Sequence, residues 1–188
     1  PFALAITVFI VKKFAPSAQG HGTEKVIEAV HKNSGKINIS VVPTKLFATV
    51  LTIFAGGSVG KEGPGAQIGA SLASFIAMKL NFSNRDRKKI VICGISAGFA
   101  SVFGTPLAGA IFGVEILIVG ALMYDILLPS VVAGFSAFLV AKMFGINYTY
   151  FYIAFYSSFD FNYVLLSKVI LGGIFFGLVA DFIITTLS

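Results

Sequence analysis

Long apolar segments, separated by short polar connectors, set the pattern of this chain. Apolar residues dominate positions 2–11, 41–55, 89–125, 125–144 and 162–187. A helix needs about 20 mainly apolar residues to cross a bilayer. We therefore expect the end of a membrane helix over 2–11, spanning helices over about 125–144 and about 162–187, and a helix rich in small residues over about 62–80.

The polar connectors indicate where helices begin. Thr23 follows a glycine-rich turn and is expected to cap a short helix over about 24–33, which carries Glu24 early and Lys32 late, as the helix dipole favours. This helix is too short and too polar to span a bilayer. Ser83 is expected to cap the helix that follows the next charged loop.

The apolar segment between Lys89 and Asp125 contains Glu115 as its only Asp, Glu, Lys, Arg or His residue. Its length, about 35 residues, exceeds one span and falls short of two spans with a turn. A Gly-Thr-Pro break at 104–106 predicts two unequal helices that meet within or near the membrane, the proline beginning the second and the threonine capping it. Such a break must be buried in protein or line a cavity. Further along, the tyrosines of 147–152 suit an interfacial belt.

Composition excludes most soluble classes. The chain of 188 residues is 56% hydrophobic and only 12% charged, with a mean hydropathy of +0.91, whereas a soluble domain carries about 25% charged residues. The net charge of +6 lies in polar connectors, which indicates positive-inside orientation and not nucleic-acid binding. The single cysteine excludes a disulfide framework within the chain. Both ends lie in hydrophobic segments, so we expect part of a longer protein.

The stretch 56–69 places Lys61 and Glu62 among glycines, directly before an apolar helix. An ionisable group in a membrane is functional by default, and a helix N-terminus presents bare N–H groups that suit an anion. Glu62 is thus interpreted as the protein's own anion in a place that a dissolved anion also occupies. Lys61 either draws anions toward the site or anchors the surface. From these patterns alone, we expect a polytopic α-helical transport protein or part of one.

The same residues resemble a known family. The run 60–64, Gly-Lys-Glu-Gly-Pro, resembles the signature G-[KR]-E-G-P of the ClC family of chloride channels and proton-coupled chloride transporters. Residues 15–22 resemble its first signature region, and 67–69 follow the glutamate as in the family. Residues 97–115 resemble its AG…F…PLAG…F..E segment. The resemblance covers essentially the whole chain.

The resemblance implies a fold and an assembly. We expect an all-α polytopic membrane protein of the ClC type, with short and broken helices, in the cell membrane. Residues 1–188 would form most of the first of two inverted-topology repeats within a single transmembrane domain. A homodimer is expected through helices around 106–143. The second repeat, with a third anion-binding motif and usually a tyrosine, is absent from this sequence.

The resemblance also implies a site. Glu62 would be the gating glutamate, whose carboxylate moves away or takes up a proton to let an anion pass. Neither a metal nor another cofactor is expected, and the bound species would be chloride or another halide, with protons as a second partner. The anion-binding positions implied are Gly20, His21, Gly22, Thr23, Gly60, Lys61, Gly63 and Pro64.

Three departures from the family pattern keep alternatives open. His21 stands where the family usually has a chloride-contacting serine, so it is either a turn residue or an anion or proton contact, and Glu24 replaces the proline that follows. Ile116 stands where proton-coupled members carry an acceptor glutamate, while the preceding Glu115 is either an interface residue or an alternative proton site. The run 103–106 resembles the fluoride-exporting branch of the family.

The main hypothesis is therefore chloride permeation gated by Glu62, of the voltage-gated chloride channel or chloride transporter type. Fluoride/proton antiport is the alternative within the same family. An intramembrane enzyme or a scaffold is a remote alternative, because the two histidines, His21 and His31, lack metal-ligand spacing such as H-E-x-x-H.

Overall fold

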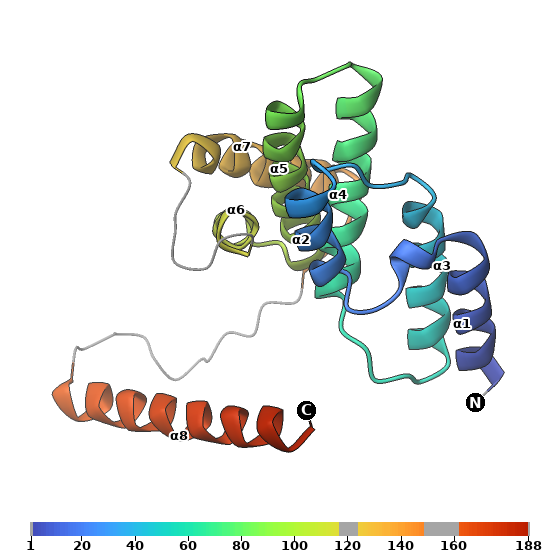
Figure 1. Cartoon of the computed structure of the whole chain (residues 1–188). Helices are drawn as coiled ribbons and strands as arrows, with labels where there is room; N and C mark the ends of the chain where they lie inside the picture. Colours follow the sequence, from blue (N-terminus) through green and yellow to red (C-terminus); the bar gives the residue numbers. More distant parts are fainter. Residues whose placement is uncertain (1, 117–123, 149–161, 188) are drawn as a thin grey trace. The chain divides into compact units, whose positions relative to one another are not determined.

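The structure is a computed structural model that describes residues 2–116, 124–148 and 162–187. Every regular element in these ranges is helical. Residues 1–148 form one compact unit and residues 149–188 a second, and each is described by itself (Figure 1). In chain order the elements are α1 (Phe2–Phe14), the 3-10 turn η1 (Pro16–Ala18), α2 (Thr23–Lys32), α3 (Val41–Phe54), α4 (Glu62–Lys79), α5 (Asn84–Phe103), α6 (Pro106–Glu115), α7 (Tyr124–Met143) and, in the second unit, α8 (Tyr163–Leu187).

Helices α4 and α5 pack side by side along much of their length (Figure 1). Glycines form their interface, so that backbone meets backbone. A Cβ atom added at Gly69 would overlap the carbonyl oxygen of Gly94, and one added at Gly98 would overlap that of Gly65. Small residues let helices approach this closely where lipid supplies no hydrophobic driving force. The α4–α5 pair is the rigid frame from which the loops of the first unit extend.

Glycines also bring α6 close to α5, and α7 close to α6. Gly109 and Gly113 of α6 lie against Ser96 of α5, and Gly134 of α7 lies against the backbone of Pro106. Larger apolar side chains fill the space between these contacts and are almost fully buried: Val91, Ile95, Val114 and Ile126.

A second pair, α1 and α3, lies beside α4 (Figure 1). The Thr7 and Thr52 hydroxyls are 3.4 Å apart between the two helices. The outer face of α3 keeps large apolar side chains exposed, with Phe47 at 65% and Phe54 at 88%. Soluble monomers rarely show contiguous apolar surface of this kind, so this face fits a protein or lipid neighbour.

Most predicted helices are confirmed. The ends predicted at 62–80, 125–144 and 162–187 differ from those of α4, α7 and α8 by one residue at most. The break at 104–106 separates α5 from α6, with the proline in the first turn of α6, as predicted. The Ser83 hydroxyl caps α5 by accepting a hydrogen bond from the Asp86 amide at 3.1 Å.

Two predicted caps are wrong in detail. Gly22, and not Thr23, is the N-cap of α2, and Thr23 is its first residue. The cap position has a φ of 88°, which glycine adopts far more readily than threonine. Thr105 occupies the N-cap of α6, but its hydroxyl makes no capping hydrogen bond.

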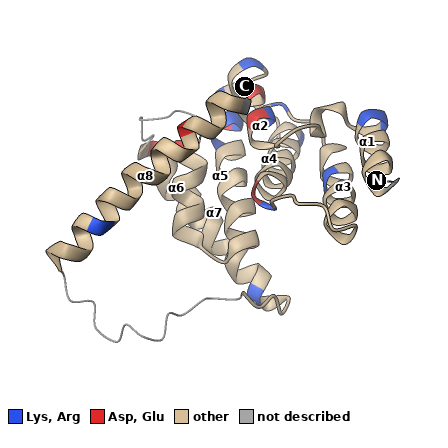
Figure 2. Ribbon diagram, turned by 90° about the horizontal axis from the view of Figure 1, so that it is seen from below, with Lys and Arg blue, Asp and Glu red and all other residues tan. Residues whose placement is uncertain are grey.

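Charged residues gather near helix ends (Figure 2). Lys89 near the start of α5 pairs with Asp125 at the start of α7 at 2.5 Å. The apolar lengths that follow are nearly free of charge, and in the described residues α7 and α8 are long and apolar enough to cross a bilayer.

Of the predicted tyrosine belt, only residues 147 and 148 lie within the described residues. Tyr148 is half-buried, and its hydroxyl donates a hydrogen bond to the Ser101 carbonyl oxygen at 2.8 Å. Its ring covers Gly104 at the α5–α6 break and stacks on Phe138 with centroids 5.7 Å apart. Tyr148 thus packs within the first unit, and the remaining belt residues lie outside the described residues. The broken backbone is covered by protein, as a break at membrane depth requires.

Candidate anion site

Two glycine-containing turns meet where α2 and α4 begin. The N-cap glycine of α2, Gly22, lies against the carbonyl group of Gly63, and a Cβ atom built at Gly22 would lie 2.7 Å from that oxygen. In the other direction, the carbonyl oxygen of His21 lies against the Cα of Gly63 and leaves no space for a side chain there. The two helix N-termini are therefore held together by backbone contact.

Lys45 of α3 holds the first of these turns from beneath. Its side chain is 7% exposed, and its ammonium group donates hydrogen bonds to the carbonyl oxygens of Ala18 at 2.9 Å and Gly20 at 2.8 Å. Within the described residues it has no acidic partner. An ammonium group in a buried setting is costly unless hydrogen bonds compensate it, and the two carbonyl groups that compensate Lys45 are those of the turn it fixes.

Gln67 of α4 adds a third attachment. Its side chain is 1% exposed, and its amide nitrogen donates to the Ser17 carbonyl oxygen at 2.9 Å. Its Oε1 atom is buried without a hydrogen-bond partner in the structure as described. Lys45 of α3 and Gln67 of α4 therefore both hold the segment 17–22 by hydrogen bonds to its backbone.

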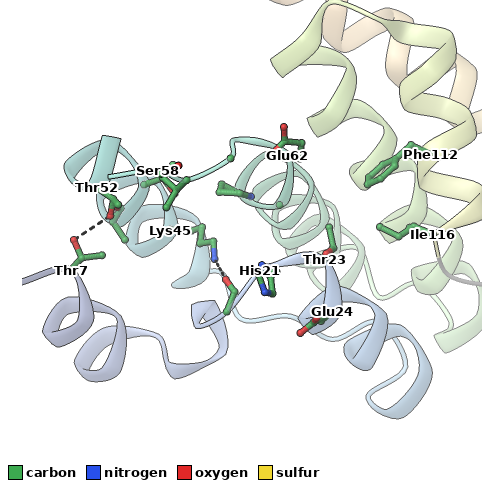
Figure 3. A pocket seen from close by; sticks show the side chains of 17 residues that line it. Thr7, His21, Thr23, Glu24, Lys45, Thr52, Ser58, Glu62, Phe112 and Ile116 are labelled. Atoms are coloured by element: carbon green, nitrogen blue, oxygen red, sulfur yellow. Dashed lines mark hydrogen bonds between the residues drawn. The ribbon is translucent and has the colours of Figure 1, made fainter. Parts of the chain in front are cut away.

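A cavity of about 680 Å³ opens beside the two turns. Figure 3 shows Glu62 and Glu24 toward opposite ends of the view, with His21, Thr23 and Lys45 between them. Seven of the predicted site residues line this cavity: Gly20, His21, Thr23, Gly60, Glu62, Gly63 and Pro64. The structure therefore brings together residues from two motifs that lie about forty positions apart in the sequence.

Glu62 is the first residue of α4, as the sequence predicts. Its carboxylate folds back over Gly60, where an added Cβ atom would overlap Oε2. The side chain is exposed to the cavity, and its carboxylate makes no hydrogen bond or ion pair within the described residues. A carboxylate at a helix N-terminus is favoured by the dipole, and an unpaired one is free to move.

Three predicted residues do not line the cavity. Gly22 is buried beneath it, where it joins the two turns. Lys61 is directed toward α5, with its ammonium 5.1 Å from the centroid of the Phe103 ring. Glu115 is exposed at the end of α6, while the adjacent Ile116 lines the cavity together with Phe112. At the position where the proton-coupled pattern requires a glutamate, this chain therefore has the aliphatic side chain of Ile116.

Sequence reasoning missed two charged residues of the cavity, Lys45 and Glu24. Lys45 interrupts the apolar run 41–55, and an ionisable residue in such a run is itself a signal of function. Glu24 was predicted to favour the helix dipole and to replace a proline of the first signature, but not to line the site. With Glu62, the cavity has two carboxylates and one ammonium, which sum to a charge of −1 when His21 is neutral.

Short helices whose N-termini border a polar cavity, within an apolar helical chain, define a class: polytopic membrane proteins that handle ions or small substrates. The profile of the voltage gated chloride channel family matches residues 3–188, nearly the whole chain. The chain belongs to this family, and it is part of an integral membrane protein.

Similar proteins come from several bacteria. The chain is 42% identical over 132 residues to a chloride/fluoride channel protein of Pseudomonas syringae pv. tomato, covering 70% of this chain and 29% of that protein. It is 35% identical over 117 residues to the voltage-gated ClC-type chloride channel ClcB of Yersinia pseudotuberculosis, covering 62% and 28%. The H(+)/Cl(-) exchange transporter ClcA of Vibrio cholerae is 31% identical over 115 residues, covering 61% and 25%. The chain thus matches less than a third of the length of these relatives.

The crystal structure of a CLC-type fluoride/proton antiporter superimposes with a TM-score of 0.82 at 27% identity. It covers 93% of this chain and 43% of the antiporter. The ClC-type fold predicted from the sequence is therefore confirmed for this part of the protein. The family consists of channels and transporters and not of enzymes, which sets aside the intramembrane enzyme.

Proposed function

We propose that this chain forms one wall of a transmembrane anion pathway and that Glu62 is its gate. The observation that carries the proposal is the Glu62 carboxylate, unpaired within the described residues, at the N-terminus of α4 and at the edge of the cavity. Backbone N–H groups at helix N-termini favour an anion without holding it as tightly as a full positive charge would. Chloride or another halide is the expected occupant, and Gly20, Gly22, Thr23, Gly60 and Gly63 supply the backbone around it.

The proposed gating step depends on the charge of the Glu62 carboxylate. With Glu62 ionised, its carboxylate competes with a dissolved anion for the same N-terminal groups. Protonation or outward rotation of the side chain removes the competing charge, and the anion then enters. The carboxylate can rotate because it makes no hydrogen bond or ion pair within the described residues, and because Gly60 beneath it has no side chain.

Fluoride/proton antiport is the second candidate. Two similarities favour it: the relative named as a chloride/fluoride channel protein and the solved fluoride/proton antiporter. Ile116 in the cavity lining favours a chloride pathway without the inner proton acceptor that coupled chloride transporters carry. The choice between channel and antiporter is therefore a question of whether protons move with the anion.

The dimer expected from the resemblance remains a proposal. The helices concerned, α6 and α7, keep apolar side chains exposed within the first unit: Leu107, Ile111, Leu128, Val132, Phe135 and Leu139. A second copy of the protein is the proposed neighbour of this face.

The decisive experiment measures chloride and fluoride efflux from liposomes that contain the full-length protein, between about pH 5 and about pH 8. We expect efflux that rises at acidic pH, and Glu62→Gln should remove most of that rise while leaving efflux high. A proton-sensitive dye in the same vesicles distinguishes antiport from passive flux. Intact proton-coupled flux in Glu62→Gln would contradict the assignment, as would the absence of any anion flux in the wild-type protein.

Glu28→Gln is the matched control. Glu28 lies on α2 outside the cavity, where the hydrogen bond and charge of Lys25 lower the pKa of its carboxyl group. Because this pKa is lowered, the Glu28 carboxylate stays ionised throughout the assay range. Its replacement should leave the pH profile unchanged.

A further inference from the structure

An apolar groove of about 630 Å³ lies between α1 and α3 and shares no lining residue with the cavity at the two turns. Its volume is in the range of sites that hold a small molecule. The exposed Phe47 and Phe54 on the outer face of α3 belong to this groove. Large apolar side chains make up most of its lining: Ile10, Phe14, Phe47, Val50, Leu51 and Phe54.

The two helices of the groove run in opposite directions. The Thr7 hydroxyl lies beside that of Thr52, whereas Phe14 lines the groove together with Ser40. The end of α1 is therefore beside the start of α3. The 14 residues of α3 are about 21 Å long at about 1.5 Å per residue, which exceeds half of a hydrocarbon core about 30 Å thick. One acyl chain of a lipid therefore fits along the groove.

Positive charge gathers at the end of the groove where α1 ends and α3 begins. Lys12 and Lys13 are in the last turn of α1 and are exposed. The Lys13 ammonium lies 5.4 Å from the centroid of the Phe9 ring and 5.7 Å from that of Phe14, a groove residue. Such contacts hold an ammonium group beside an aromatic ring without neutralising it. Neither α1, α3 nor the segment 33–40 contains an acidic residue (Figure 2).

The lining of the groove also distinguishes a lipid from a protein helix as its occupant. Helices of this protein approach each other through glycine, as Gly65 and Gly69 of α4 do against α5. Neither glycine nor alanine is among the described residues that line the groove. Small residues are what allow helices to pack closely in a membrane, so a flexible acyl chain fits this lining better than a helix does.

We propose that this groove binds an anionic phospholipid, with one acyl chain along the groove and the phosphate at Lys12, Lys13 and Ser40. The Ser40 hydroxyl makes no capping hydrogen bond to α3, so it is available to donate to the phosphate. Basic residues beside a membrane helix are typical of the cytoplasmic side, and the anionic lipids of the cytoplasmic leaflet attract them. The proposal depends neither on the anion pathway nor on the gate.

A lipid in this groove contacts the helix that holds the turn beside the cavity. Thr44 lines the groove, while the adjacent Lys45 donates its hydrogen bonds to the carbonyl oxygens of Ala18 and Gly20. Helix α1 leads directly into the same turn. A lipid that holds α1 against α3 therefore stabilises both attachments of the turn, and it should raise the thermal midpoint of the protein.

Native mass spectrometry of the detergent-solubilised full-length protein tests the proposal with phosphatidylglycerol and phosphatidylcholine of identical acyl chains. We expect phosphatidylglycerol to bind about tenfold or more tightly, because each lysine near a membrane surface adds attraction to an anionic lipid. It should also raise the thermal midpoint more. The double change Lys12→Gln and Lys13→Gln should bring the two affinities close together. Glycerol phosphate, which has no acyl chain, should leave the midpoint unchanged.

Two matched controls separate the groove from general surface effects. Lys79→Gln, at the exposed end of α4, should keep the preference for phosphatidylglycerol. Val50→Trp fills the groove and should weaken the binding of both lipids, whereas Leu72→Trp on the exposed face of α4 should not. Equal affinities in the wild-type protein, or a preference that survives the double lysine change in a monodisperse sample, would overturn the proposal.

A photoreactive phenylalanine analogue at position 47 identifies the occupant in vesicles of the same two lipids. Phe47 lines the groove and is 65% exposed in the first unit. We expect irradiation to add the mass of one phosphatidylglycerol molecule. A crosslink to another segment of the protein or to a second copy would show that a protein helix covers the groove, and it would overturn the proposal. Neither result bears on the proposed function, which is tested by anion efflux and its dependence on Glu62.

Discussion

At the α4–α5 interface, Gly65 and Gly69 meet Gly98 and Gly94, and a Cβ atom at any of these positions would overlap the other helix. At the neighbouring cavity, glycines leave backbone and a carboxylate facing open space. The first region lies between two packed helices, and the second lies where helices begin. Glycine therefore allows close packing along a helix and leaves backbone beside a cavity at its end, and the two regions should respond to substitution in different ways.

The largest effect is expected at the packed interface. Gly98→Val places branched carbon atoms where the carbonyl of Gly65 lies, so α4 and α5 must separate. Overpacking costs about 1–3 kcal/mol or more in well-packed interiors, and separation would also displace the N-terminus of α4. We expect loss of a monodisperse peak in size-exclusion chromatography of the detergent-solubilised protein.

Leu72→Val on the exposed face of α4 is the matched control, since Leu72 is 43% exposed in the first unit. It should retain the monodisperse peak. Normal folding and normal anion flux in Gly98→Val would show that the α4–α5 contact tolerates widening and is not the rigid frame described above.

A smaller effect is expected at Lys45, which holds the turn beside the cavity. Lys45→Met removes two hydrogen bonds to the turn and one positive charge beside the cavity. A unit charge at roughly 10 Å contributes about 1–2 kcal/mol under an effective dielectric constant of about 20. We therefore expect chloride affinity to fall by on the order of tenfold in calorimetry. Lys79→Met, at the exposed end of α4, should leave the affinity unchanged.

Equal affinities in wild-type and Lys45→Met protein would mean that the lysine acts only on folding. The thermal midpoint, measured on the same samples, separates these roles. Loss of affinity without a large fall in the midpoint would identify the charge as the more important contribution.

The smallest effect is expected at the α5–α6 break. Tyr148→Phe removes the hydrogen bond to the Ser101 carbonyl but keeps the ring that covers Gly104. One such bond contributes about 0.5–1.5 kcal/mol. The thermal midpoint should fall by a few degrees, with anion efflux unchanged. A fall as large as that of Tyr148→Ala would indicate that the hydroxyl, and not the ring, holds the break.

The sequence predicted the helices well because apolar length and polar interruption are both local signals. It placed Glu62 at the start of α4 and found the break at 104–106 for the same reason. The N-cap of α2 was missed by one residue, since a threonine is a common cap, and the positive φ that required glycine depends on the contact between Gly22 and Gly63.

The composition of the cavity could be predicted only in part. Motifs at 20–23 and 60–64 supplied seven of its lining residues. Lys45 contributes from α3, and only the fold brings that helix to the turn. Lys61 is the opposite case: it was predicted as a site residue but does not line the cavity. It follows a glycine and precedes Glu62 in sequence, yet its side chain lies over Phe103, because a residue just before a helix can point away from the next one.

In the contact between the two turns, main-chain atoms of residues 21 and 22 lie against main-chain atoms of residue 63. The side chain of His21 is therefore not part of the contact that joins the two turns. Position 21 can accept a different side chain while the two helix N-termini stay in contact.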